Sequence, residues 1–187
     1  PKTVPNVGSI TPKVEVSREN GKLFVFSENY GGDLMVLNSN GSTWSQPMEF
    51  DANVRGSKVE SDFFINEGED HILFSSKRGG RGLDIYESRK GSGGLWSNPT
   101  PIKGNVNGDW DEDSPYLSTD GTTLYFSSNG LESMGGFDVF ASNWDEIKQE
   151  WSKPKNLGFP INTIDDEINY QLNPDNISGF LSSNRLH

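Results

Sequence analysis

Acidic side chains are the groups in this sequence whose types and spacing could support chemistry. They gather in two segments, residues 109–113 and 165–167, each just before a predicted strand. Carboxylate oxygens are preferred ligands of Ca²⁺, and most glycoside hydrolases need a pair of carboxyl groups. The spacing matches no calcium loop, and carboxylates that cap turns explain the same residues. We therefore predict no metal site and no cofactor, and treat as candidate binding residues Asp111, Glu112, Asp113, Asp165, Asp166 and Glu167.

Other catalytic chemistry finds little support in the sequence. The chain has two histidines, His71 and His187, and no cysteine. It contains no G-x-S-x-G motif, so a serine or thiol hydrolase is not expected and disulfides are excluded. The sequence predicts a protein that is not an enzyme. Two alternatives stay open: a glycan-binding module, and a propeller glycoside hydrolase with two carboxylates in its channel.

Short β-strands must position these acidic segments. Residues 114–118 and 123–128 are rich in aromatic and β-branched side chains and are joined by Asp120-Gly121. Asp-Gly between two such runs is a strong hairpin signal, because both residues tolerate the positive φ of a type I′ turn. Residues 137–142 and 154–157 predict a third and a fourth strand, the last on an edge that accepts proline. Together they predict a four-stranded antiparallel meander.

This meander recurs along the chain. A W-S-x-P motif opens at three tryptophans that are 52 and 55 residues apart, Trp44, Trp96 and Trp151. A glycine-rich turn precedes three aspartates that are 51 and 54 residues apart, Asp33, Asp84 and Asp138. A period of about 50 residues with four strands in each unit is typical of a propeller blade.

The repeated residues are predicted to be structural. We expect the aspartates to accept hydrogen bonds from backbone N–H groups and the tryptophans to pack between blades. A set of functional carboxylates and a sugar-stacking platform are the alternatives. Arg78 and Arg185, with Tyr116 and Tyr170, are predicted to join the acidic residues at a channel mouth that binds a peptide or a glycan. Solvated arginines on loops would give the same pattern.

The predicted fold is all-β: a β-propeller segment of about three and a half four-stranded antiparallel blades from a larger propeller. The predicted blades are residues 11–60, 61–113 and 114–168, followed by a partial blade, 169–187. Residues 1–10 are predicted to be an upstream tail or an outer strand. Ring closure protects strand edges, so we expect the other blades of a ring of about six or seven to lie elsewhere. The first and last blades should then not pair.

Composition limits the classes of partner. The net charge of −11 disfavours nucleic-acid binding, which depends on clustered Lys and Arg. Only 32% of the residues are hydrophobic, while 11% are aromatic, so a few large rings must fill the core. No apolar run approaches the ~18 residues of a membrane helix, and no membrane insertion is expected. The chain starts at Pro1 without a signal sequence, so we expect a processed or excised product.

Several motifs resemble a known repeat. LYFSSN, GGFDVF, W-S-K-P-K-N-L-G-x-P-I-N and D-E-x-x-Y are similar to the WD40-like β-propeller repeat of the TolB type, over residues 11–187. The variant is the one found in envelope proteins of Bacteroidota, where the propeller often precedes an OmpA-like peptidoglycan-binding domain. These 187 residues contain no such domain.

The resemblance implies a function and a location. It points to a non-enzymatic scaffold that docks other envelope proteins in the periplasm, in association with the outer membrane. Subunits of the type IX secretion system are the partners that it implies. Peptidoglycan would be reached only through the OmpA-like domain.

Overall fold

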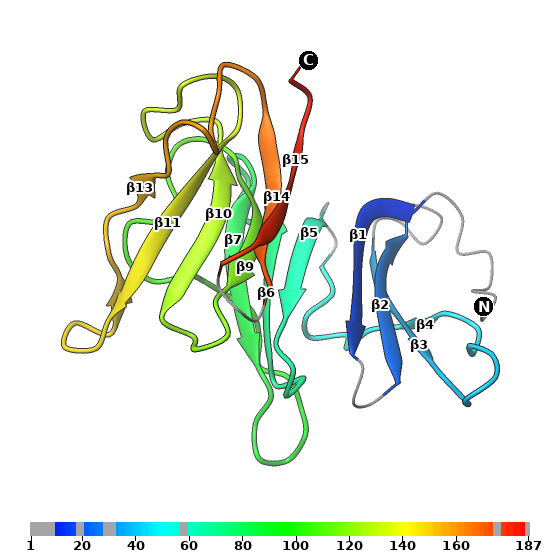
Figure 1. The fold of residues 1–187 in the computed structure, drawn as a ribbon. Coiled ribbons are helices and arrows are strands. Elements are labelled where there is room, and N and C mark those ends of the chain that lie inside the picture. Colours follow the sequence, from blue (N-terminus) through cyan, green and yellow to red (C-terminus); the bar gives the residue numbers. More distant parts are fainter. Residues whose placement is uncertain (1–9, 18–20, 28–32, 57–59, 174–176, 186–187) are drawn as a thin grey trace.

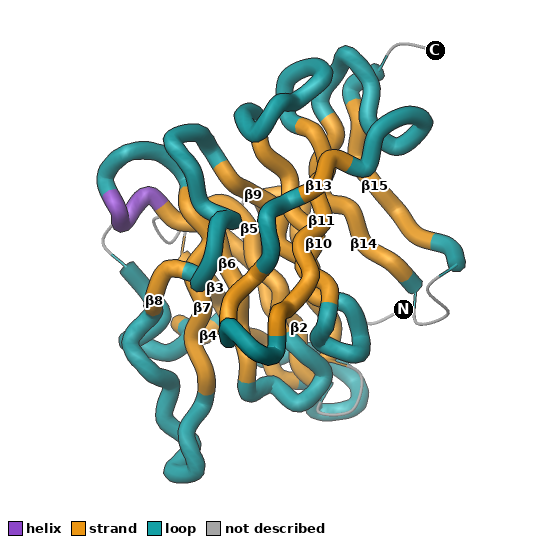
Figure 2. Tube along the Cα trace, turned by 90° about the vertical axis from the view of Figure 1, so that its left-hand side faces the viewer, coloured by secondary structure: helices purple, strands orange, loops and turns teal. Residues whose placement is uncertain are grey.

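The computed structural model describes residues 10–17, 21–27, 33–56, 60–173 and 177–185, with the backbone alone for 10–17. Strands account for nearly all of its regular structure (Figure 1, Figure 2). In this described part the one helical element is η2 (Lys77–Gly79), a single 3-10 turn. No helix there is long and apolar enough to cross a membrane. The predicted all-β class is confirmed.

The strands form four antiparallel sheets that follow one another along the chain. The first sheet contains β1 (Ile10–Ser17), β2 (Lys22–Ser27), β3 (Asp33–Asn38) and β4 (Met48–Glu49). The second contains β5 (Glu60–Ile65), β6 (His71–Ser76), β7 (Asp84–Arg89) and β8 (Thr100–Pro101). The third contains β9 (Glu112–Leu117), β10 (Thr123–Ser128), β11 (Asp138–Asp145), β12 (Glu150–Trp151) and β13 (Lys155–Asn156). The fourth has only β14 (Glu167–Leu172) and β15 (Gly179–Ser183).

Local sequence explains the hairpins. The turn between β9 and β10 differs from the predicted type I′ turn, because Gly121 has φ +73° but Asp120 does not have a positive φ. The turn runs from Ser118 to Gly121, whose N–H donates to the Ser118 carbonyl at 2.8 Å. The Asp120 carboxylate secures this turn by accepting a hydrogen bond from the Thr122 N–H at 3.0 Å. Along β10, Leu124 and Phe126 alternate with half-buried or polar residues and turn to one face. That face packs on the second sheet.

The first strands of the later sheets start earlier than the sequence predicted. β5, β9 and β14 begin at Glu60, Glu112 and Glu167, one or two residues before the predicted blade starts. The sequence analysis placed Glu112 and Glu167 in segments just before the predicted strands. Each of these side chains is instead buried and hydrogen-bonded within its own sheet. The blade boundaries stay predictions, and of the predicted tail only Ile10 lies within the described residues, where it begins β1.

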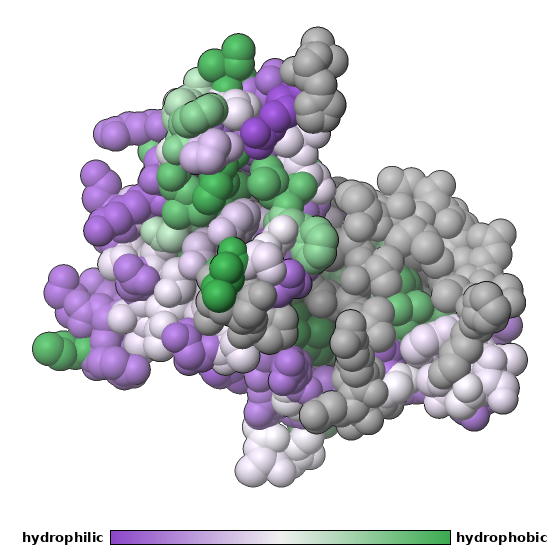
Figure 3. Space-filling model, in the orientation of Figure 1, coloured by the Kyte–Doolittle hydropathy of each residue, from purple (hydrophilic) through white to green (hydrophobic). Residues whose placement is uncertain are grey.

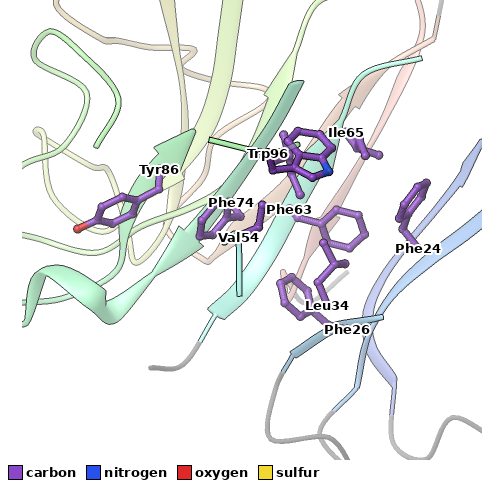
Figure 4. Packing of buried hydrophobic residues seen from close by; sticks show 10 residues of the cluster. Phe24, Phe26, Leu34, Val54, Phe63, Ile65, Phe74, Tyr86 and Trp96 are labelled. Atoms are coloured by element: carbon purple, nitrogen blue, oxygen red, sulfur yellow. The ribbon is translucent and has the colours of Figure 1, made fainter. Parts of the chain in front are cut away.

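Aromatic side chains fill the space between neighbouring sheets. Phe26 of β2 packs edge-to-face on Phe63 of β5, with ring centroids 5.2 Å apart. Figure 4 shows Trp96, from beyond β7, in the same cluster. Between the second and third sheets, Leu73 and Phe126 belong to one buried cluster. A few large rings therefore hold the sheets face to face, which the low hydrophobic content of the chain requires.

The two ends of this series of sheets do not pair within the described residues. There, β1 is hydrogen-bonded to β2, and β15 to β14, with no ladder between the first and fourth sheets. All five residues of β15 are exposed. The fold is thus an open, propeller-like array of blades, which agrees with the predicted partial propeller.

Candidate functional site at the inner strands

A buried glutamate opens the first strand of three sheets; we call β5, β9 and β14 the inner strands. Each glutamate accepts a hydrogen bond from a serine at the end of the second strand of its sheet. The donor–acceptor distances are 3.1, 2.9 and 2.8 Å for Ser76–Glu60, Ser128–Glu112 and Ser183–Glu167. The predicted binding residues Glu112 and Glu167 therefore tie two strands of one sheet together.

The two candidate arginines bind these glutamates. Arg78 Nη2 lies 3.0 Å from Glu60 Oε1 and also donates to the Val54 carbonyl at 2.9 Å. Arg185 Nη2 lies 3.4 Å from Glu167 Oε1 and donates to the Ile161 carbonyl at 3.0 Å. Both side chains are thus held beside the inner strands by a buried glutamate and a backbone carbonyl, in place of the solvated loop position considered from sequence.

The third sheet has no arginine at the equivalent place. Gly130 stands there, and a side chain on it would overlap the ring of Trp110, which lies against this glycine. Glu112 is left with two neutral donors, the Gly108 N–H at 2.8 Å and the Ser128 hydroxyl. Burial raises the pKa of Glu112 to about 7, and the charges of Asp84 and Asp111 act in the same direction.

The acidic segments also join neighbouring sheets. Asp111 Oδ1 accepts from the Leu83 N–H at 2.7 Å, and Asp166 Oδ1 accepts from the Phe137 N–H at 2.9 Å. Both donors stand just before the third strand of the preceding sheet. Asp165 is half-buried, and its N–H donates to Thr163 Oγ1. Among the described residues, no group of three or more His, Cys, Asp or Glu side chains is arranged to hold a metal ion.

Asp113 differs from the other acidic candidates because the charge of Asp62, on a neighbouring strand, acts on it. It lies on β9, and Asp62 lies on the neighbouring inner strand β5. Asp113 Oδ1 accepts from the Ser61 hydroxyl at 2.8 Å and from the Ser114 N–H at 2.7 Å. Burial raises the pKa of Asp113, and the charge of Asp62 raises it further. Asp62, which the sequence analysis did not single out, is only 4% exposed.

The two candidate tyrosines lie between sheets. Tyr116 packs edge-to-face on Phe64 of β5, with centroids 5.5 Å apart, and its hydroxyl donates to the Leu172 carbonyl at 2.8 Å. Tyr170 packs against Tyr125, with ring centroids 5.1 Å apart. The structure thus places the tyrosines in inter-sheet contacts and the arginines on buried glutamates.

The repeated aspartates have three different environments. Asp138 is fully buried, and its Oδ2 accepts from the Met134 N–H and from Asn156 Nδ2, both at 2.6 Å. Burial raises the pKa of the half-buried Asp84. Asp33 Oδ2 lies 3.9 Å from Arg55 Nη1. Asp33 also pairs differently across the sheet. Asp84 and Asp138 lie opposite the second serine of a Ser-Ser pair. Asp33 lies opposite Ser27, which is equivalent to the first serine of that pair.

The repeated tryptophans are packing residues to different degrees. Trp96 and Trp151 are buried in the clusters between the sheets. Trp44 is half-buried and packs against the cluster that contains Leu23 and Val25. All three are less exposed than Trp110, which is 59% exposed.

Two asparagines that the sequence analysis did not single out bind the backbone of a strand through their side-chain amides, as a neighbouring strand would. Asn107 accepts from the Ile85 N–H at 2.8 Å and donates to the Ile85 carbonyl at 2.9 Å. Asn162 makes the same pair of bonds to Val139, both at 2.8 Å. Each asparagine follows the tryptophan of a W-S-x-P motif by 11 residues. That shared offset was the signal that could have revealed them.

Comparison with known proteins supports the fold. No family model and no curated protein matches the sequence. An endo-arabinase from Bacteroides thetaiotaomicron VPI-5482 aligns with 84% of this chain at 18% identity and a TM-score of 0.52. A 6-phosphogluconolactonase-like protein from Bacteroides uniformis ATCC 8492 aligns with 97% at 13% identity and a TM-score of 0.50. The fold is propeller-like. The chain spans 59% and 50% of the lengths of these two proteins.

These comparisons correct two predictions. The resemblance to a TolB-type, OmpA-associated or type IX secretion protein is wrong, because no family model supports it and the structural neighbours carry other names. The motifs behind it are explained by local structure: the second serine of LYFSSN bonds Glu112, and the aspartate of GGFDVF is buried. The prediction that the protein is not an enzyme is overturned too, because both neighbours carry enzyme names. Carboxylate chemistry needs no histidine, cysteine or serine motif.

Proposed function

We propose that this chain is part of a carbohydrate-active β-propeller and that its buried carboxyl pair, Asp62 and Asp113, belongs to the glycan site. The observation that carries the proposal is the meeting of these two groups from neighbouring inner strands, with the pKa of Asp113 raised. Inner strands line the central channel of a propeller. A carboxyl pair there is what the glycoside-hydrolase alternative required.

Asp113 has an environment that suits one of the two roles in this chemistry. Most glycoside hydrolases use one carboxyl group that stays protonated and donates to the leaving oxygen, and a second that acts as base or nucleophile. Asp113, whose pKa burial raises, suits the first role. Asp62 is proposed as the base or nucleophile. Trp110, on the linker that leads into β9, is 59% exposed and is proposed as an apolar surface for a sugar ring.

The names of the structural neighbours suggest which ligand to test first. One neighbour is an endo-arabinase, so linear arabino-oligosaccharides are the first choice. The other name implies a phosphorylated lactone. A net charge of −11, with acidic linkers beside the pair, disfavours an anionic phosphate ligand. A neutral glycan is therefore favoured, and hydrolysis is proposed for a whole propeller that contains this segment.

Calorimetry with the 187-residue chain tests the proposal. We expect arabino-oligosaccharides to bind, and Asp113→Asn or Asp62→Asn to weaken binding about tenfold, equivalent to about 1.4 kcal/mol. Glu67→Gln is the matched control, because Glu67 is exposed in the turn between β5 and β6. Circular dichroism should show that each variant is folded. Equal affinities for the parent and Asp113→Asn, or no binding of the oligosaccharides, would contradict the proposal.

A further inference from the structure

One position of the repeat carries a different kind of residue in the third sheet. Arg78 and Arg185 each stand two residues after the second serine of a Ser-Ser pair, and Gly130 has this place in the third sheet. Arg78 binds a buried glutamate and lies over the ring of a buried phenylalanine. The third sheet keeps a buried phenylalanine and a buried glutamate at the equivalent positions, Phe126 and Glu112, but not the guanidinium.

A second residue of the repeat changes together with the first. Trp110 stands two residues before the buried glutamate of β9, whereas the equivalent positions before β5 and β14 carry the polar residues Lys58 and Asp165. The Trp110 side chain lies against Gly130, where a Cβ would overlap the Cγ and Cδ1 atoms of the indole. The two residues that set the third blade apart therefore contact each other.

Space, and not backbone conformation, requires glycine at position 130. Gly130 does not have a positive φ, so its backbone suits residues with a side chain. The atoms that a Cβ would overlap lie at the base of the Trp110 side chain. A small rotation of the ring cannot relieve such an overlap, so any side chain at position 130 must drive the indole out of its place.

The exchange gives the fold little in return. Glu112 accepts hydrogen bonds from two neutral groups, the Gly108 N–H and the Ser128 hydroxyl, where the other two glutamates also have a guanidinium. Trp110 stays largely exposed, so it gains only a small part of the free energy that a buried indole would gain. A departure from the repeat without a gain in packing is expected where the residue serves a function.

Exposed apolar side chains gather at the same end of the molecule. Met134, in the loop between β10 and β11, and Ile164, in the linker to β14, are both exposed. The two segments touch, because Gly135 lies directly against the backbone of Ile164. Figure 3 shows hydrophobic residues at the upper end, where Figure 1 places this loop and this linker. Apolar surface of this kind marks a binding face.

We propose that Gly130 is a positioning residue for Trp110. Because it has no side chain in the place of the arginine, it holds the indole at the start of β9, where the ring serves as the stacking surface of the glycan site. The role of the ring in binding rests on the proposed function. The effect of Gly130 on the ring does not, and it can be measured without a ligand.

Fluorine NMR of the 187-residue chain labelled with 5-fluorotryptophan tests the position of the ring. The five tryptophans should give five resonances, and the one that disappears in Trp110→Phe belongs to Trp110. In Gly130→Ala this resonance should shift while the other four stay, which also shows that the variant is folded. Gly93→Ala is the matched control, because a Cβ there meets open space in an exposed loop. An unmoved Trp110 resonance in Gly130→Ala would overturn the proposal.

Calorimetry with linear arabino-oligosaccharides tests the role of the ring. Gly130→Ala should weaken binding about fivefold, the size expected when an aromatic contact is lost, and Gly93→Ala should not. Gly130→Arg combined with Trp110→Asp reproduces the arrangement of the fourth sheet and should bind as weakly as Trp110→Asp alone. If the parent binds no oligosaccharide, the proposed function is wrong, and the fluorine resonance still decides whether Gly130 positions the ring. If parent and Gly130→Ala bind equally well, the positioning role is wrong.

Discussion

At the scale of single residues, the three buried glutamates show how one substitution changes the chemistry of a repeat. Glu60 and Glu167 each have a guanidinium within 3.4 Å. At the equivalent place Glu112 has Gly130, covered by Trp110, so only the hydrogen bonds from the Gly108 N–H and the Ser128 hydroxyl offset the cost of burying its charge. The result is a carboxyl group with a pKa of about 7 inside a repeat that otherwise fixes its glutamates by ion pairing.

This difference makes stability depend on pH. The pKa of Glu112 rises from its ordinary 4.5 to about 7 on folding, so the folded state binds the proton more tightly. The stabilisation is complete below pH 4.5 and is lost as the pH rises through 7. We expect the free energy of unfolding to fall by up to about 3 kcal/mol across this range. In Glu112→Gln this part of the fall should disappear, because an amide does not ionise.

Urea unfolding at pH 5, 6, 7 and 8 measures the effect. The informative quantity is the difference between the parent and Glu112→Gln, since other carboxyl groups titrate in both. Glu67→Gln, at an exposed turn position, should follow the parent. A Glu112→Gln curve parallel to that of the parent would show that Glu112 does not titrate in this range.

At the scale of elements, the sheets are joined by close backbone approaches as well as by aromatic packing. The loop after β8 reaches the third sheet, where Gly104 forms a parallel bridge with Trp151 of β12. Gly104 has φ +94°, and a Cβ there would overlap the backbone of Trp151. Glycine is therefore needed at this position for two reasons, its conformation and the space available.

Two glycine substitutions separate these reasons. Gly121→Ala should cost about 1 kcal/mol of unfolding free energy, because Gly121 has φ +73° but open space around it. Gly104→Ala should cost about 1–3 kcal/mol more, because its Cβ must also displace the backbone of β12. Urea unfolding of both variants gives the comparison. Equal losses would mean that the second and third sheets separate here at little cost.

At the scale of the whole molecule, the two ends of the array are unlike. In the first sheet Leu23, Val25, Met35 and Leu37 are buried, although they lie on strand faces turned away from the cluster shared with the second sheet. In the fourth sheet Phe180 and Leu181 are exposed. The end that contains β15 is the one that lacks cover among the described residues.

Hydrogen exchange should show this asymmetry. Amides of β10, which is paired on both sides, should be strongly protected. The amides of β15 that point away from β14 should exchange at close to the rate of an unstructured chain, because they lack a partner strand. Mass spectrometry or NMR on the 187-residue chain measures both. Protection of β15 equal to that of β10 would show that its free edge is already covered.

Much of the fold could be predicted from local sequence. Strand and turn positions depend on neighbouring residues: Gly121 supplies the positive φ in the turn, and the alternation around Leu124 and Phe126 defines a face. The period of the W-S-x-P motif then repeats the unit. The pairing register was not predicted, however. Asp33 pairs with a residue one position earlier in its neighbouring strand than Asp84 and Asp138 do. The ladder is set by pairing across strands, not by spacing along one.

The composition of the site was decided by the tertiary structure alone. The sequence predicted that acidic residues, arginines and tyrosines would share one mouth, but it could not show that Arg78 binds Glu60 or that Asp113 meets Asp62 from another sheet. These meetings join residues 18 and 51 positions apart. The pKa of a carboxyl group follows from its burial and from the charges that surround it. Local pattern fixes which residues form a strand, while the distance between sheets fixes which side chains meet, and only the folded chain sets that distance.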